Sequence, residues 1–423
     1  MIPEQVPRVA IIGGGAAGFF GAIACAEIAN GQMDISIFEM GSNFLTKVKI
    51  SGGGRCNVTN GLENTFDFSE HYPRGKRELI GPLSRWSQED TVWWFRENGV
   101  ELKTESDGRI FPVTDSSQTV IDCLTGVAKE KGIEAKNNCC VNRIDKSDEG
   151  SFRIWINDQD DPIEADYLLV ATGGIRSAQS RNLLESMGHE FTSPVPSLFT
   201  FEIEDNRLTE LSGLSVPSAS VVIGHLGMKS VGPLLITHWG LSGPVILRLS
   251  ALGARELEQL NYDFKIMVNW LGEEWKSEQL SQRIESERNL NGPRKIMKSS
   301  PIKEIPNRLW KRIVSKAEVT DDQTWSELTK QATLRIINSL IAEEFKVSGK
   351  SLNKSEFVTC GGVLLRDLDL RTMESRSVEN LFFAGEVMDI DGLTGGFNFQ
   401  SAWTTGRIAG EEIAQRGASA KPN

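Results

Sequence analysis

The sequence predicts an α/β protein in which a parallel sheet flanked by helices is interrupted by a β-rich insertion and a helical insertion. A strand, a glycine turn, a helix and a second strand follow one another within residues 8–39. Two apolar runs of the kind that is buried on both faces of a parallel sheet lie far apart, at residues 167–172 and 380–384. The chain between them changes character over about residues 190–350, which indicates an insertion.

The first segment predicts a β-α-β unit. Residues 8–12 (RVAII) form a short apolar run, and residues 16–29 are rich in alanine and contain no proline, as is typical of a helix. The turn residues Asn30 and Gly31 precede a second strand at residues 34–39 (DISIFE). A crossover of this length joins parallel strands by a right-handed connection.

Helices and further strands follow. Ser87 to Asp90 resembles a capping box, and the aromatic residues 93–95 behind it are predicted to pack in the core. The composition predicts strands over residues 139–144, 152–157 and 167–172.

The insertion has two parts. Residues 198–224 are rich in β-branched and turn residues, whereas residues 273–346 are polar, helical and anchored by tryptophans. A buried strand at residues 380–384 and a helix at residues 397–415 then return to the first domain. The predicted division is residues 1–190 and 351–423 for a Rossmann-like nucleotide-binding domain, 191–272 for a β-rich, barrel-like unit and 273–350 for a helical unit.

The charge balance argues against some partners. The chain has 46 basic and 57 acidic side chains, a net charge of −11 and a pI of about 5.2. Such a chain repels a phosphate backbone, so no nucleic-acid partner is expected. The apolar stretch near the N-terminus is too short and too rich in glycine to span a bilayer, and no membrane partner is expected.

The cysteines favour a cytoplasmic location. None of the six forms a C-x-x-C pair or a metal-binding spacing, so we expect reduced thiols, no metal and no dithiol relay.

The first motif with chemical meaning is G-x-G-x-x-G at residues 13–18, directly between a strand and a helix. Its glycines let a pyrophosphate approach the backbone at the helix N-terminus. Glu39 ends the next strand, where a carboxylate accepts hydrogen bonds from a ribose and repels a 2′-phosphate. The position of the glycines between a strand and a helix, and their spacing to Glu39, favour a nucleotide site over a glycine turn that binds nothing. The expected nucleotide is FAD or NAD rather than NADP.

The second motif is residues 49–60 (KISGGGRCNVTN), where three glycines stand between Lys49 and Arg55. Consecutive N–H groups in such a loop form an anion-binding nest with cations at its margins. The alternative is a flexible surface loop. Cys56 is predicted to be a small packing residue rather than a nucleophile, because no histidine lies nearby in the sequence.

Two further motifs complete the set. Residues 170–174 (VATGG) take a buried strand onto a small-residue turn, and Glu386 follows the strand at residues 380–384. Gly395 and Gly396 then present the N-terminus of the last helix, whose dipole would stabilise an anionic reduced flavin ring.

Together and in this order, the four motifs resemble the FAD-binding two-dinucleotide-domain flavoproteins. More narrowly, the chain resembles the bacterial FAD-dependent flavoproteins described as NAD(P)/FAD-dependent oxidoreductases or aminoacetone-oxidase-family FAD-binding enzymes. The segments that carry this resemblance are residues 49–60, 108–113 (GRIFPV), 237–244 (THWGLSGP), 359–363 (TCGGV) and 385–400 (GEVMDIDGLTGGFNFQ). The resemblance implies a Rossmann-like FAD domain interrupted by a β-barrel-like unit and a small helical unit, with the glycine loops lining the flavin.

Members of that family are similar to enzymes that reduce conjugated enones of steroid-like substrates and to oxidases of small amino ketones. After the ATGG turn this chain continues directly with Ile175, Arg176 and Ser177, where many relatives have a longer segment with glycine, serine and tyrosine. The substrate is therefore not carried over from the resemblance.

The predicted FAD-binding residues are Gly13, Gly14, Gly15, Ala16, Ala17, Gly18, Glu39, Met40, Lys49, Ser51, Gly52, Gly53, Gly54, Arg55, Cys56, Asn57, Val141, Ala171, Thr172, Gly173, Gly385, Glu386, Asp391, Gly395, Gly396, Phe397 and Asn398.

His238 and Arg55 are the predicted catalytic residues. His238 would exchange a proton near the flavin, and the alternative is a histidine that bonds the backbone at an interdomain joint. Arg55 would hold a substrate carbonyl, and the alternative is pairing with phosphate.

The leading functional prediction is an FAD-dependent oxidoreductase in which flavin N5 exchanges a hydride with a small organic substrate. NADH or NADPH is the expected transient electron donor, with reduction of an unsaturated carbonyl compound as the reaction. The alternatives are an oxygen-using oxidase of small amines or amino ketones and, in another class, an FAD-binding RNA-modifying or regulatory protein.

Overall fold

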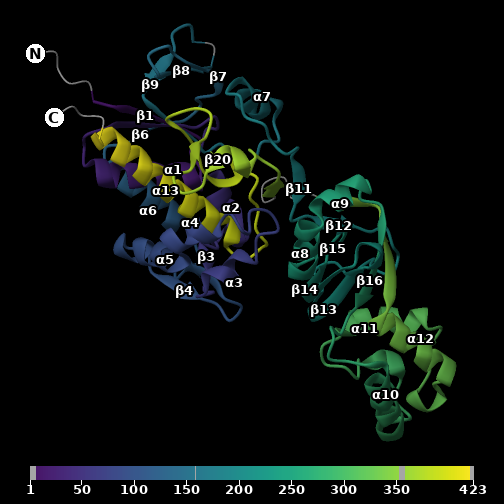
Figure 1. Cartoon of the computed structure of the whole chain (residues 1–423). Coiled ribbons are helices and arrows are strands. Elements are labelled where there is room, and N and C mark those ends of the chain that lie inside the picture. Colours follow the sequence, from purple (N-terminus) through teal and green to yellow (C-terminus); the bar gives the residue numbers. More distant parts are fainter. Residues whose placement is uncertain (1–5, 158, 352–357, 420–423) are drawn as a thin grey trace, which may run out of the picture. The chain divides into compact units, whose positions relative to one another are not determined.

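The computed structural model describes residues 6–157, 159–351 and 358–419. The chain divides into two compact units, which Figure 1 shows in the colours of the sequence. Unit 1 is Met1–Pro196 with Lys354–Asn423, and unit 2 is Ser197–Asn353.

The main sheet of unit 1 contains the two strands of the predicted β-α-β unit, β1 and β2. Its strands, in spatial order, are β20 (Leu368–Asp369), β21 (Glu374–Ser375), β22 (Leu381–Phe383), β10 (Tyr167–Val170), β1 (Arg8–Ile12), β2 (Asp34–Phe38) and β6 (Glu134–Lys136). The pairs from β22 to β6 are parallel, and Ile11 is in register with both Ile37 and Leu169. β1 and β10 lie inside the sheet and are buried, which explains their continuous apolar sequences.

Helix α1 (Ala16–Ala29) lies against the C-terminal helix α13 (Phe397–Ser419), as Figure 1 shows. Small residues allow their backbones to touch: a Cβ on Gly410 would lie 2.1 Å from the carbonyl oxygen of Gly21. Aromatic side chains pack beside this contact. Of the three aromatics predicted to lie in the core, Trp94 and Phe95 are buried, but Trp93 is 60 % exposed because it lies on the outer face of its helix.

The remaining elements of unit 1 surround this sheet. Its other helices are α2 (Thr46–Gly54), α3 (Thr65–Ser69), α4 (Ile80–Arg85), α5 (Gln88–Glu97), α6 (Ser117–Glu130) and α7 (Ala178–Ser186). Its smaller sheets are β3 (Thr59–Asn60) with β5 (Arg109–Pro112) and β4 (Leu102–Thr104), β7 (Val141–Lys146) with β8 (Phe152–Ile156) and β9 (Ile163–Ala165), and β11 (Val195–Ser197) with β19 (Val358–Cys360). The capping box of Ser87 and Asp90 at the start of α5 is confirmed.

Unit 2 contains an antiparallel sheet with helices. Its strands, in spatial order, are β17 (Glu343–Val347), β16 (Phe264–Asn269), β13 (Ser215–Ile223), β14 (Met228–Ile236), β15 (Gly240–Ser242), β12 (Thr200–Glu202) and β18 (Gly349–Ser351). Its helices are α8 (Pro244–Leu252), α9 (Ala254–Gln259), α10 (Ser277–Asn291), α11 (Asn307–Lys316) and α12 (Lys330–Ile341).

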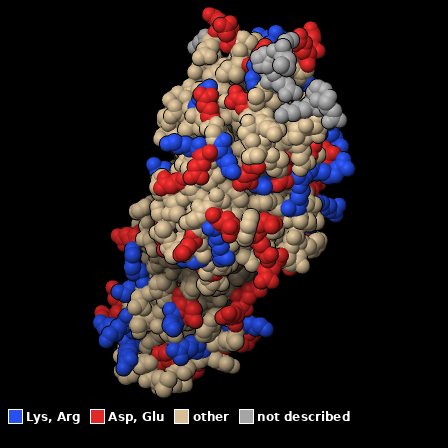
Figure 2. Space-filling model, turned by 90° about the vertical axis from the view of Figure 1, so that its left-hand side faces the viewer, with Lys and Arg blue, Asp and Glu red and all other residues tan. Residues whose placement is uncertain are grey.

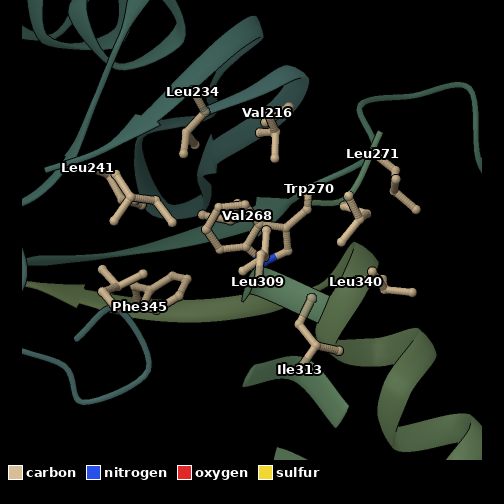
Figure 3. Packing of buried hydrophobic residues seen from close by; sticks show 14 of the residues in the cluster. Val216, Leu234, Leu241, Val268, Trp270, Leu271, Leu309, Ile313, Leu340 and Phe345 are labelled. Atoms are coloured by element: carbon tan, nitrogen blue, oxygen red, sulfur yellow. The ribbon is translucent and has the colours of Figure 1, made fainter. Parts of the chain in front are cut away.

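The sequence separates residues 191–272 from residues 273–350, but the structure places both in one unit with a shared core. Trp270, at the end of β16, donates its backbone N–H to the carbonyl of Leu340 in α12 at 2.9 Å. Its ring lies among Val268, Phe345 and Leu309 (Figure 3). The helices thus cover apolar side chains of the sheet, and neither part buries its own apolar face alone.

The predicted α/β class with a Rossmann-type domain is confirmed. In the part of the chain that the structure describes, no helix combines the length and the apolar character that crossing a membrane requires.

Candidate functional site

The predicted glycine turns meet at one edge of the main sheet of unit 1. β1, β2, β10 and β22 run parallel, so the residues after them share the carboxyl edge of the sheet. These residues are the loop 13–15, Glu39, the turn 171–173 and Gly385. Ligands of open α/β sheets bind at this edge.

The first glycine loop packs closely against the strands and is open at Gly15. Gly13 has a φ of +109°, and a Cβ there would lie 2.3 Å from the carbonyl oxygen of Ala171. A Cβ on Gly18 would lie 1.9 Å from the carbonyl oxygen of Gly13. Gly15 differs, because nothing lies within 4 Å of its Cβ position. Helix α1 also has no side-chain cap and no acidic residue in its first turn, so its N-terminal N–H groups face an open space suited to an anion.

Glu39 fixes the loop that a ribose would contact. One carboxylate oxygen accepts from the N–H of Gly14 and the other from the N–H of Gly41, each at 2.7 Å. Its backbone carbonyl accepts from the N–H of Cys139, which brings the segment before Val141 to this corner. Each carboxylate oxygen can accept a further bond, so the predicted contact with a ribose fits the geometry.

Glu39→Gln is expected to weaken FAD binding by about 1 to 3 kcal/mol, because an amide nitrogen cannot accept the bond that a carboxylate oxygen accepts. Titration of the flavin-free protein with FAD measures the change. Glu134→Gln, at an exposed side chain on β6, is the matched control. Equal affinity in both variants would contradict the ribose contact.

The second motif folds differently from its prediction as a loop from Lys49. Lys49 lies in helix α2, and the chain leaves helical geometry at Ser51. The next three glycines all have positive φ, and the Cβ positions of Gly53 and Gly54 face open space. Cys56 is fully buried, and burial raises the pKa of its thiol to about 12, which fits a packing residue.

Arg55 is held by the protein itself. Its guanidinium lies 4.0 Å from the centre of the Phe111 ring and donates to Glu105 at 2.7 Å and to Asp115 at 3.4 Å. The hydrogen bond to Glu105 raises the pKa of Arg55. Its contact with phosphate or with a substrate carbonyl stays a prediction.

Glu386 also has protein partners. Its carboxylate accepts from the N–H of Thr359 at 2.8 Å and from the ammonium group of Lys47. Neither partner is indicated by a local sequence pattern. Lys47 belongs to the second motif's helix, and its ion pair with Glu386 joins segments that lie 339 residues apart in the sequence.

The last glycine turn is tied to the second motif. A Cβ on Gly396 would lie 2.5 Å from the carbonyl oxygen of Thr59. Asn60 donates to the carbonyl of Gly395 at 3.0 Å, and Asn57, with its amide oriented to satisfy its neighbours, accepts from the N–H of Gly396 at 3.0 Å. The turn before α13 is therefore built on β3, so the two motifs that are predicted to line the flavin lie in contact.

Asp391 is fully buried and paired with Arg74, a partner that the sequence analysis missed. Nearby, the hydroxyl of Tyr72 donates to the carbonyl of Phe397 at 2.7 Å, and burial raises the pKa of Tyr72. Arg74 donates to both carboxylate oxygens of Asp391, and the predicted contact of Asp391 with the cofactor stays a prediction.

His238 lies in unit 2, on the turn between β14 and β15. The turn is closed by the bond from the N–H of Thr237 to the carbonyl of Gly240 at 2.8 Å. The His238 ring is exposed and has no hydrogen-bond partner among the residues that the structure describes. Its catalytic role and its alternative role at an interdomain joint both stay predictions.

A family model described as HI0933-like protein Rossmann domain matches residues 7–412. Curated relatives match over nearly the full chain. The "Ribosomal RNA dihydrouridine synthase" of Haemophilus influenzae is 27 % identical, over 98 % of this chain and 100 % of its own length. The "3-dehydro-bile acid delta(4,6)-reductase" of Clostridium scindens is 26 % identical, over 97 % of this chain and 99 % of its own length.

The solved 3-ketosteroid-delta4-(5alpha)-dehydrogenase from Rhodococcus jostii RHA1 has a similar fold. It aligns with a TM-score of 0.54 and 13 % identity, over 98 % of both chains.

Proposed function

Because this chain belongs to the HI0933-like Rossmann-domain family and is an FAD-dependent oxidoreductase, we propose that it reduces a carbon–carbon double bond conjugated to a carbonyl group, with NADH or NADPH as electron donor. The observation that carries the proposal is the uncapped N-terminus of α1 at the carboxyl edge of the sheet, where the Cβ position of Gly15 is open. Glu39, which would contact the ribose, and the glycine turn before α13 support the proposal.

The names of the relatives share one chemistry. A dihydrouridine synthase adds two hydrogens to the uracil ring, in which the double bond is conjugated to a carbonyl. A delta(4,6)-reductase of a 3-dehydro bile acid reduces ring double bonds near a ketone. A planar ring with an enone-type bond is therefore the substrate class, and uracil in RNA and a 3-keto steroid are its two candidates.

The residues of this chain bind and orient the reactants. The N-terminal N–H groups of α1 would hold the pyrophosphate, and Glu39 would hold the ribose. The N-terminus of α13 would stabilise negative charge on the bound ring. When bound, FAD supplies hydride transfer from the nicotinamide to the substrate carbon β to the carbonyl. The carbon next to the carbonyl takes a proton, for which His238 is the proposed donor.

The proposal is tested by anaerobic titration of the purified yellow protein with NADH and NADPH, followed by an enone or by uridine and then by air. Loss of the oxidised flavin absorbance with either nucleotide, and its return on addition of the unsaturated carbonyl compound, would support a reductase. A flavin that stays oxidised with both nucleotides but is reduced by a small amine would instead identify an oxidase or dehydrogenase.

His238→Ala is expected to lower kcat by about 10²- to 10⁴-fold, the usual contribution of a general acid, while the flavin spectrum stays unchanged. His225→Ala is the matched control, because His225 is also exposed on a turn of unit 2. Turnover that is equal in the two variants would refute His238 as the proton donor. A decline of kcat at high pH that is present in wild type and in His225→Ala but absent from His238→Ala would support it.

A further inference from the structure

Residues 288–316 of unit 2 are strongly basic. This stretch contains nine Lys and Arg side chains and one acidic side chain, Glu304. The whole of unit 2 has 20 basic and 19 acidic side chains, whereas unit 1 has 26 and 38. The net charge of −11, which argues against a nucleic-acid partner, is therefore an average over an acidic unit and a unit with a concentrated basic segment.

The fold exposes seven of these nine cations. Helix α11 buries Leu309, Trp310, Ile313 and Val314 in the core of unit 2, so its other face points to solvent. Arg308, Lys311 and Arg312 have the i, i+3, i+4 spacing of that single face.

The preceding segment is fixed against α11. The indole N–H of Trp310 donates to the carbonyl of Ile296 at 2.9 Å. The side chain of Asn307 accepts from the N–H of Ser300 at 2.9 Å. Five exposed cations of this segment and of α11 that are not ion-paired with described residues are called the basic surface here: Arg294, Lys298, Lys303, Arg308 and Lys311.

None of the five has an ion pair or a side-chain hydrogen bond with any residue that the structure describes. Neighbouring cations are paired: Lys295 with Asp322, and Lys316 with Glu343. Figure 2 shows Lys and Arg side chains gathered along the lower left edge of the view, in the part that unit 2 forms. Unpaired like charges repel one another, and a polyanion would remove that cost while releasing its own counterions.

We propose that the basic surface binds the phosphate backbone of RNA and so brings an RNA substrate to this enzyme. The five cations are spread along 18 residues of chain, which suits a row of phosphates rather than one small anion. An anionic membrane is the less favoured partner, because Leu290 is the one exposed large apolar side chain within residues 288–316. The inference rests on the proposed function, since uracil in RNA carries the conjugated double bond to be reduced.

The test measures binding of the full chain with FAD to a fluorescein-labelled RNA stem-loop of about 30 nucleotides, by fluorescence anisotropy over a range of salt concentrations. The test variant is Lys298→Gln with Arg308→Gln and Lys311→Gln. The control variant removes the same charge from paired lysines of unit 2, as Lys229→Gln with Lys265→Gln and Lys346→Gln.

We expect the test variant to bind RNA at least about tenfold more weakly and to lower the slope of log K against log salt by about 2 to 3, while the control stays within about twofold of wild type. No binding by wild type, or equal loss in both variants, would overturn the proposal. Binding to phosphatidylserine vesicles, but not to RNA, that is lost only in the test variant would overturn it in favour of a membrane.

The same proteins distinguish this inference from the proposed function. Reduction of the flavin by NADH or NADPH, and of a small enone by the reduced enzyme, is expected to be equal in wild type and both variants. A chain that reduces the enone and binds no RNA would keep the function and overturn the basic surface. A chain that binds RNA through the basic surface and reduces no unsaturated carbonyl would keep the basic surface and overturn the proposed function.

Discussion

Gly15→Val is expected to give a folded protein that purifies with less than about a tenth of the wild-type flavin content. A branched side chain at this position projects into the space where the pyrophosphate must approach the N-terminus of α1. The structure makes the test specific, because no described residue other than its chain neighbours lies within 4 Å of the Cβ position of Gly15, and its φ is −93°. The side chain therefore competes with the cofactor and not with the fold.

The measurement is the ratio of flavin absorbance to protein absorbance after purification, with circular dichroism to show that the variant is folded. Gly126→Val is the matched control, because Gly126 lies in helix α6 and its Cβ position is also free of contacts. Normal flavin content in Gly15→Val would refute the assignment of this loop to the pyrophosphate. Loss of flavin in both variants would show that the substitution acts through stability.

Arg74→Ala is expected to destabilise unit 1 by about 3 to 5 kcal/mol, because it leaves the carboxylate of Asp391 buried without its cation. Asp391 has no exposed side-chain surface, and the Arg74 side chain is 17 % exposed. The pair also sits directly before the turn at residues 392–396, so FAD binding should weaken as this turn loosens. The readout is the urea midpoint at which flavin fluorescence rises on release, measured with the same excess of FAD for each variant.

Two controls accompany this prediction. Lys265→Ala breaks an exposed ion pair with Glu344 and should change stability by less than about 1 kcal/mol. Arg74→Met combined with Asp391→Leu removes both charges and should recover most of the loss. An unchanged midpoint in Arg74→Ala would show that the pair does not support the turn.

Much of the cofactor site could be predicted from the sequence. The loop at residues 13–18, the helix behind it and Glu39 lie within about 30 residues of one another, and short-range spacing is enough to place a phosphate next to a helix N-terminus. The buried strands at residues 167–170 and 381–383 fall within the predicted ranges 167–172 and 380–384, since continuous apolar runs are typical of the interior of a parallel sheet.

Other features depend on contacts that no local pattern encodes. The same aromatic run places Trp94 in the core and Trp93 in solvent, because helical periodicity turns adjacent residues to different faces. The composition of the sequence predicts separate β-rich and helical units. In the structure the apolar side chains of the two parts pack against each other in one core. The average charge concealed the basic surface, because burial of one face of α11 gathers its cations on the opposite face.

By itself, the sequence determined the fold class, the order of the glycine turns and the kind of nucleotide they suit, because each of these follows from local backbone chemistry. Only the tertiary structure decided which turns share a wall and which charges are already paired. Asn57 meets Gly396, Lys47 meets Glu386 and Arg74 meets Asp391 across more than 300 residues of sequence. Such pairs form only when the sheet assembles and α13 packs against α1. Long-range contacts are set by the packing of whole elements and not by neighbouring residues in the sequence.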